Sequence, residues 1–199
     1  MITIINCAQN SPEWFAARLG IPTASEFANL MREKADAKTR RSYLMRLAGE
    51  RLTGKPMVRY TNADIERGHE QEPEARALYA MLTDTDPVQV GFIRNDAVRA
   101  GASPDSLIGA DGMLEIKTRA PHVHIEQLLD GEVPSEHKAQ LQGQLWIAER
   151  EWVDFLAYSP GLKPFLKRVY RDEPYIERLA KAVQIFNAEL NLIVQQVAA

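Results

Sequence analysis

Apolar and polar residues follow two different periods along this chain. Over residues 152–158 and 165–170 they alternate, and shorter runs at 88–94 and 97–102 flank Asn95-Asp96, which together predict β-strands. Apolar residues three or four positions apart instead predict helices at 11–19, 37–53, 61–82, 135–149 and 173–197. We therefore expect an α/β fold with a mixed central β-sheet flanked by helices.

Helix-start signals refine these boundaries. Ser11 with Pro12 is typical of a helix start, and Gly20 of an end. Thr23-Ala-Ser-Glu26 matches a capping box and predicts a second helix start, while Thr61 and Ser135 are expected caps of the later helices. Within 37–53 the residues expected to face inward are Tyr43, Leu44, Leu47 and Leu52.

Residues 101–118 predict a β-hairpin that carries charged groups. Its turn is Gly109-Ala-Asp-Gly112, with short apolar runs on both sides. Because side chains alternate along a strand, Glu115 and Lys117 share one face while Leu114 and Ile116 point into a core. The hairpin can fold Asp105 back beside Glu115.

Two neighbouring carboxylates repel each other as anions, so a site that keeps both ionised usually holds a hard cation. Mg²⁺ prefers oxygen ligands and keeps several waters, which leaves room for a phosphate oxygen and an attacking water. Lys117 can then orient or deprotonate that water, or stabilise charge on the phosphate. The alternative is a surface hairpin whose Glu and Lys form a weak exposed pair.

Composition and charge narrow the class of protein and the kinds of site it can carry. With 199 residues we expect a single domain over 1–199. The one cysteine, Cys7, excludes a disulfide framework and a cysteine-ligated metal cluster, and suits a reducing cytoplasm. No long apolar run predicts a membrane span, and the uncharged start at Met1 is unlike a signal peptide. Net charge is −3, yet residues 32–59 carry nine Lys/Arg against three Asp/Glu, either a phosphate-binding stripe or a solvated helix face.

Other chemistry-bearing residues lie outside the hairpin. In 61–82, Glu66, Glu70 and Glu74 recur every four residues and Glu72 lies off that stripe beside Pro73, so one of these acids can turn inward. The pattern does not say which. His122 and His124 are expected in a loop near the site, as substrate contacts or exposed groups rather than ligands. His137, Gln140 and Gln144 share one face of 135–149.

An anion pocket is expected near the second helix start. Free N–H groups there, the Thr23 and Ser25 hydroxyls and nearby Arg18 can all donate to a phosphate. The alternative is an ordinary structural cap.

Four separated blocks then resemble one family. The chain is similar, from about Ser11 to Pro160, to the λ exonuclease and YqaJ-like viral recombinase family of PD-(D/E)XK nucleases. The blocks, in order, are Trp14-Phe-Ala-Ala-Arg-Leu-Gly-Ile-Pro-Thr-Ala-Ser-Glu26, Gly68-His-Glu-Gln-Glu-Pro-Glu-Ala-Arg76, Ser103-Pro-Asp105 with Leu114-Glu-Ile-Lys117, and Ala139-Gln-Leu-Gln-Gly-Gln-Leu-Trp146.

The resemblance implies a role for each matched residue. Asp105, Glu115 and the Ile116 carbonyl would bind Mg²⁺ in a two-metal site where Mn²⁺ can substitute, and Lys117 would be the catalytic lysine. Glu72 would be a further active-site acid. Gln140 would lie near the water or phosphate, and the 5′-phosphate of the DNA would be held by Arg18, Ser25 and Thr23.

The resemblance also implies an activity and partners. Members degrade one strand of duplex DNA from 5′ to 3′, leave a 3′ tail, form ring-shaped homotrimers and hand the tail to a single-strand annealing protein. A phage or prophage origin and the cytoplasm of a bacterial host are expected.

Two departures from the family pattern are Pro22 and a short segment between Lys117 and Gln140, which leaves open what lines the DNA channel. A structure-specific or restriction-like endonuclease would share the metal site without needing the Arg18–Ser25 pocket. A catalytically silent DNA-binding protein would tolerate loss of the trio, which is intact here. Missing cysteines disfavour a RecB-like nuclease with a metal cluster.

Overall fold

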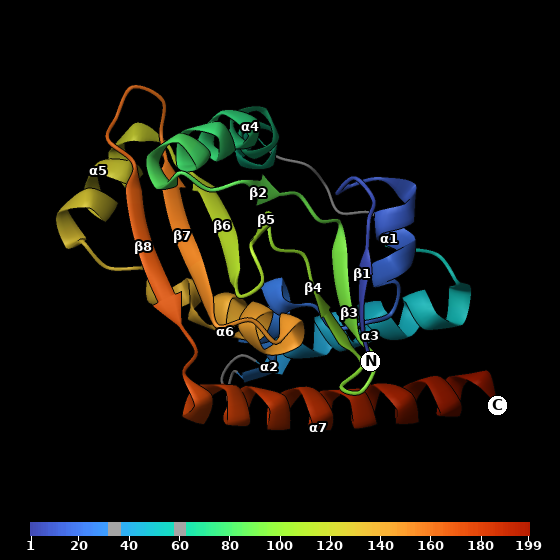
Figure 1. Ribbon diagram of the computed structural model, residues 1–199. Helices are drawn as coiled ribbons and strands as arrows, with labels where there is room; N and C mark the ends of the chain where they lie inside the picture. Colours follow the sequence, from blue (N-terminus) through green and yellow to red (C-terminus); the bar gives the residue numbers. More distant parts are fainter. Residues whose placement is uncertain (32–36, 58–62) are drawn as a thin grey trace.

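The computed structural model describes residues 1–31, 37–57 and 63–199, which form two β-sheets and the helices around them (Figure 1). In chain order the elements are β1 (Ile2–Ile5), α1 (Pro12–Arg18), the 3₁₀ turn η1 (Ala24–Glu26), α2 (Phe27–Met31), α3 (Ala37–Thr53), α4 (Ala63–Thr83), β2 (Pro87–Val88), β3 (Phe92–Asn95), β4 (Ala100–Ala102), β5 (Ser106–Ile108), β6 (Gly112–Thr118), α5 (Pro121–Asp130), the 3₁₀ turn η3 (Ser135–His137), α6 (Lys138–Ala148), β7 (Trp152–Tyr158), β8 (Phe165–Tyr170) and α7 (Glu173–Ala198).

The larger sheet is mixed and has the strand order β2-β5-β6-β7-β8. Strands β6 and β7 run parallel, with Glu115 beside Phe155, and the other neighbouring pairs are antiparallel. Strands β1, β3 and β4 form the smaller sheet, in which Ile93 pairs with Ala102. The predicted mixed sheet is confirmed, as are the strands around Asn95-Asp96 and the hairpin of β5 and β6.

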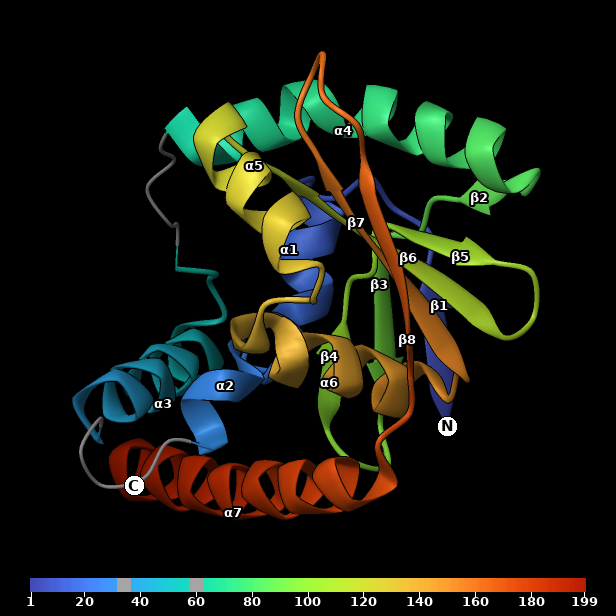
Figure 2. The ribbon, with the colours of Figure 1, turned by 90° about the vertical axis from the view of Figure 1, so that its left-hand side faces the viewer.

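Helices cover both faces of the larger sheet (Figure 2). Helix α4 crosses one face, where Ala75 and Tyr79 pack against Leu114 and Ile116. Helix α6 covers the other face, where Leu141 and Leu145 pack on Met113, Val153 and Phe155. Helix α7 lies along the base of the molecule and contacts α2, α3 and α6. Strand β6 is therefore held rigidly between two apolar layers.

Several helix boundaries follow directly from local sequence. The Ser11 side chain accepts a hydrogen bond from Trp14 N at 3.2 Å, and Pro12 occupies the first turn of α1. Gly20 has a φ of +64°, which only glycine adopts without strain, so α1 ends there. The helix expected over 37–53 has those bounds, and Tyr43, Leu44 and Leu47 are buried as expected.

Other expectations are wrong, each for a local reason. The capping box at Thr23 does not form, because the Thr23 side chain makes no cap bond and Glu26 instead binds Asn29 and Arg46. Ser135 is no cap, because a 3₁₀ turn precedes α6. Leu52 is exposed. The expected cap Thr61 lies outside the described residues, as do Arg32 and Arg59.

Two elements were not expected from the pattern. Strand β1 at the N-terminus pairs with β3, a partner about ninety positions away. Residues 121–130 form helix α5 rather than a loop, because Pro121 lies in its first turn. His124 is buried rather than exposed, with its Nε2 2.8 Å from the Lys163 carbonyl oxygen, whereas His122 is exposed. Within the described ranges, no helix is both long and apolar enough to span a bilayer.

Candidate active site

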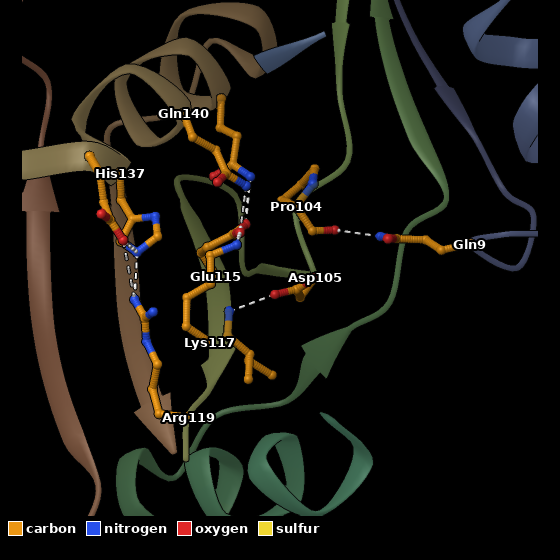
Figure 3. Close-up of polar contacts among 11 residues, drawn as sticks. Gln9, Pro104, Asp105, Glu115, Lys117, Arg119, His137 and Gln140 are labelled. Carbon is orange, nitrogen blue, oxygen red and sulfur yellow. Dashed lines mark hydrogen bonds and ion pairs between the residues drawn. The ribbon is translucent and has the colours of Figure 1, made fainter. Parts of the chain in front are cut away.

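The hairpin brings Asp105 to Glu115 through simple strand register. Ser106 pairs with Leu114, and one further step along the antiparallel pair places Asp105 opposite Glu115. Asp105 N donates to the Leu114 carbonyl at 3.1 Å, and Asp105 Oδ2 accepts from Ile116 N at 2.5 Å (Figure 3). The sequence prediction that the two carboxylates converge is confirmed.

The buried Glu115 carboxylate is surrounded by donors. Oε1 accepts from Lys117 Nζ at 2.6 Å and from Gln140 Nε2 at 2.5 Å, and Oε2 accepts from Gln144 Nε2 at 2.6 Å. Burying a charge without such partners would destabilise the folded state by roughly several kcal/mol. The donors therefore hold the Glu115 carboxylate in one orientation. The Gln144 amide oxygen is buried and has no partner among the described residues.

The groups around Asp105 act on its pKa in opposite directions. Burial raises its pKa well above the usual range, and the nearby charges of Glu115 and Glu72 raise it further, against the lowering effects of Lys117 and the Ile116 N–H. The site thus holds more negative charge than its own cations neutralise. A bound cation would relieve that repulsion.

Lys117 is held as an ammonium. Burial by itself lowers its pKa, but Glu115 and Asp105 outweigh that effect, so the net pKa is raised. In the protein without metal, Lys117 is therefore a hydrogen-bond donor and a positive charge, not a base.

Among the acids of α4, Glu72 is the one that reaches this centre. It forms an ion pair with Arg76, whose Nε donates to Ser106 Oγ at 3.0 Å. A cavity of about 210 Å³ is lined by Gly68, Glu72, Ile116, Lys117 and Thr118. Glu70 and Glu74 are exposed, and the side chain of Glu66 lies outside the described set.

Arg18, Thr23 and Ser25 also come together, with Ser103 as a fourth member. Arg18 donates to Ser103 Oγ at 3.2 Å and to Thr23 Oγ1 at 3.4 Å, and the Thr23 and Ser25 hydroxyls are 3.4 Å apart. The guanidinium carbon lies 3.8 Å from the centre of the Trp14 ring, which holds it in place. Ser103 precedes Asp105 by two residues, so the Cα atoms of these two residues are at most about 7 Å apart.

Sequence reasoning did not assign several residues around this centre to a particular contact. It placed Gln144 on the face of Gln140, one helical turn away, and left open whether these amides hold water or phosphate or are polar surface. Ser103 is adjacent to the Pro-Asp step. Arg119 continues the alternation of Glu115 and Lys117, and it contacts His137, with 2.6 Å between Arg119 Nη2 and His137 Nε2.

The donor set suits Mg²⁺. Asp105, Glu115 and the Ile116 carbonyl offer only oxygen, and the nearest imidazole, His137, is directed at Arg119 instead. Across the parts of the chain that the structure describes, no three His, Cys, Asp or Glu side chains form a complete metal cage. Mg²⁺ does not require one, because it commonly binds through one or two carboxylates and keeps waters for the substrate to replace.

This fold and site define a class. A mixed sheet whose central hairpin carries Pro-Asp and Glu-x-Lys, with helices on both faces, is the PD-(D/E)XK nuclease fold. The sequence profile of the YqaJ-like viral recombinase domain matches residues 13–151, and the chain belongs to that family.

Solved structures agree with this assignment. The alkaline exonuclease LHK-Exo from Laribacter hongkongensis, solved alone and in complex with dAMP, is 37% identical, with a TM-score of 0.87 over 94% of this chain and 96% of that one. A phage-related exonuclease from Haemophilus somnus has a TM-score of 0.59 over 89% of this chain and 95% of its own; at 14% identity it shows a shared fold only. No curated protein sequence matches the chain.

Proposed function

We propose that the chain is a Mg²⁺-dependent exonuclease that degrades one strand of duplex DNA from its 5′ end and leaves a 3′ single-stranded tail. The observation that carries this proposal is the adjacency of two sites. Ser103, which binds Arg18 in the cluster, lies two residues before Asp105, so a terminal phosphate in the cluster would bring the next phosphate toward the carboxylates.

The relatives support the same class of substrate. LHK-Exo was crystallised with dAMP, a nucleoside monophosphate, which is the product expected of an enzyme that removes DNA one nucleotide at a time. We extend DNA as substrate and exonuclease action to this chain on the strength of 37% identity over nearly the full length.

Mg²⁺, or Mn²⁺ in its place, would be held by Asp105, Glu115 and the Ile116 carbonyl, with Glu72 beside a second ion. When bound, it would polarise the scissile phosphate and lower the pKa of a nearby water. The pKa of Asp105 is raised, and a metal binds its ionised form. Metal binding at Asp105 would therefore compete with protonation of the same carboxyl.

The protein's own groups supply the remaining steps. The Lys117 ammonium donates to the phosphate as negative charge develops there. Gln140 and Gln144 keep Glu115 in position during the reaction. Arg18 and its hydroxyl partners hold the terminal phosphate, so that cleavage begins at the end of the strand rather than within it.

We further propose a homotrimeric ring that acts with a single-strand annealing protein in the cytoplasm of a bacterial host. Family membership supports this assembly and partner. A chain of net charge −3 that encloses DNA must direct basic side chains inward, and exposed Lys38, Arg41 and Lys55 of the α3 region are available for that.

Digestion of linear and covalently closed circular duplexes, with and without Mg²⁺, tests the proposed function. We expect loss of the linear duplex only when Mg²⁺ is present, with the closed circle intact. Nicking or linearisation of the circle would show an endonuclease instead. Digestion in the presence of a chelator would show that cleavage does not require a metal ion.

A further inference from the structure

Arg119 continues the charged face of the catalytic strand. It follows β6 directly, its N–H donates to the Tyr158 carbonyl at 2.8 Å, and two-residue spacing directs its side chain to the face of Glu115 and Lys117. Figure 3 shows Arg119 and His137 on one side of Lys117 and Asp105 on the other. A second cation on this face therefore lies just beyond Lys117.

His137 holds Arg119 as a hydrogen-bond acceptor. A guanidinium has only donors, so the contact of 2.6 Å requires an unprotonated Nε2 on the imidazole. Burial, with the charges of Lys117 and Arg119, lowers the pKa of His137 to about 3, in agreement with that assignment. The ring also lies against Phe155 of β7, with centroids 5.3 Å apart. The pair is thus rigid and carries a net positive charge.

That charge is only weakly neutralised. Glu136 pairs with Arg119 Nη2 at 3.9 Å and lies 3.4 Å from His137 Nε2, but its side chain is 69% exposed to solvent. Arg119 Nε is buried and has no hydrogen-bond partner among the described residues. A buried donor without a partner is costly, and an oxygen of a bound ligand would remove that cost.

The order of the strands places this group relative to the DNA. Ser103, which binds Arg18, lies in the segment that leads into β5, on one edge of β6. His137 lies over β7, on the other edge. The terminal-phosphate cluster, the carboxylates and Arg119 therefore follow one another across the sheet.

Resting on the proposed 5′→3′ direction, we infer that Arg119 binds the phosphodiester on the 3′ side of the scissile phosphate, with His137 as its positioning residue. The ligand is a backbone phosphate of the strand being cut, which Arg recognises through paired N–H donors. Arg119 would hold the strand that remains after each nucleotide leaves, and so keep its new end aligned for the next cut.

A neutral-linkage scan tests this inference directly. Each of the first four internucleotide linkages of a 5′-phosphorylated duplex is replaced in turn by a methylphosphonate, and the rate of the first cut is measured. For the wild-type protein we expect a neutral second linkage to slow the first cut roughly twentyfold, the effect of one lost charged hydrogen bond. Arg119→Ala should cut slowly on the normal duplex and show no further loss on that substrate.

Variants separate a DNA contact from a structural role. Arg119→Lys keeps the positive charge but not the paired N–H donors. It replaces Arg119→Ala in the scan if the alanine variant folds poorly. His137→Ala should lose most of the sensitivity to the second linkage, and His137→Gln, whose amide oxygen can accept from Arg119, should restore it. Arg178→Ala, on the exposed face of α7, removes the same charge far from the site and should behave as wild type. Equal sensitivity to the second linkage in wild type and Arg119→Ala would overturn the inference.

Failure of the proposed function gives a different result. If the wild-type protein releases nucleotides from the 3′ end, or cuts internally, the proposed direction is wrong. The same scan around the linkage actually cut then reports whether Arg119 contacts an adjacent phosphate. Loss of coupling at every adjacent linkage would overturn the Arg119 assignment on its own.

Discussion

Lys117 and Glu115, two residues apart on β6, are joined by an ion pair of 2.6 Å between Nζ and Oε1. Glu115 lies beneath α6 and is buried, whereas the Lys117 side chain is half-buried at the mouth of the site. The Glu115 carboxylate raises the pKa of Lys117 against the lowering effect of burial, and so favours the ammonium form. Substitution of one residue of this centre therefore changes the chemistry of its neighbours as well as its own.

Loss of either carboxylate should abolish cleavage and spare DNA binding. Asp105→Ala removes a ligand oxygen, and Glu115→Gln keeps the shape of the side chain while removing its charge. We expect a rate reduction of a thousandfold or more (roughly), by analogy with loss of a catalytic metal ligand. Single-turnover rates and binding in Ca²⁺, which should support binding without cutting, are the measurements.

Near-normal turnover by either variant would show that the metal site is assigned to the wrong residues. Thermal melts with and without Mg²⁺ provide the control. Mg²⁺ should raise the melting temperature of the wild-type protein and leave that of Asp105→Ala unchanged.

Lys117→Ala should be inactive and still bind Mg²⁺, because it removes the donor to the phosphate and leaves both carboxylates in place. The measurement is Mg²⁺ affinity by calorimetry alongside cleavage. Loss of Mg²⁺ binding in this variant would assign Lys117 a structural role in the metal site instead of a catalytic one.

Arg18 should give the enzyme its preference for phosphorylated ends. A terminal phosphate carries more charge than an internal one, and Arg18 can form two parallel hydrogen bonds with it. We expect faster digestion of 5′-phosphorylated than of 5′-hydroxyl duplex. Arg18→Ala should erase most of that difference, at a cost of about 2 kcal/mol or roughly thirtyfold in rate. Equal initial rates on the two ends for the wild-type protein would exclude the pocket from the mechanism.

Gln144 should strengthen metal binding, because its hydrogen bond orients the ligand Glu115. Gln144→Leu removes the donor to Glu115 Oε2, and loss of a group that orients a metal ligand typically costs roughly tenfold or more in metal affinity or activity. The measurement is the Mg²⁺ concentration that gives half-maximal rate. Gln142→Leu is the matched control, because Gln142 is buried on the same helix but binds the Tyr170 carbonyl and Asp172 N–H instead. An equal shift in the two variants would contradict a specific role for Gln144.

His137 should make the metal-free protein less stable in acid. Its folded-state pKa of about 3 lies below the unfolded value near 6.5, so the unfolded chain takes up the proton more readily. The stability associated with neutral His137 is complete above about pH 6.5 and is lost as pH falls toward 3, at up to about 1.4 kcal/mol per pH unit.

Urea unfolding between pH 4 and 8 measures that slope. His137→Gln should be less pH-dependent than the wild-type protein over this range, since all other titrating groups are shared. Identical slopes for the two proteins would show that His137 does not enter the pH dependence of stability.

Local sequence predicted the central hairpin well. A turn between short apolar runs, with period-two alternation, is enough to place Glu115 and Lys117 on one face and Asp105 opposite. All of that information lies within eighteen residues of the chain. For the same reason the bounds of α3 and the two strands after α6 could be predicted closely.

Contacts between distant segments could not be predicted in the same way. Arg18 binds Ser103, 85 positions away, and Gln144 binds Glu115, 29 positions away. Helical spacing places Gln144 on the face of Gln140, but it does not name the partner of either side chain, because each contact depends on how α1 and α6 pack against the sheet. The acid of α4 shows the same limit. Spacing could not select Glu72, and only the family resemblance and then the packing of α4 on β6 did so.

The direction of degradation is the central claim, and a hairpin-capped duplex with one open, 5′-phosphorylated end tests it most directly. Each nucleotide removed is followed by gel electrophoresis with a label at the closed end, in Mg²⁺. We expect stepwise loss of the strand that carries the 5′ end, release of mononucleotides and an intact 3′ strand. Shortening from the 3′ end, or internal fragments at early times, would contradict it.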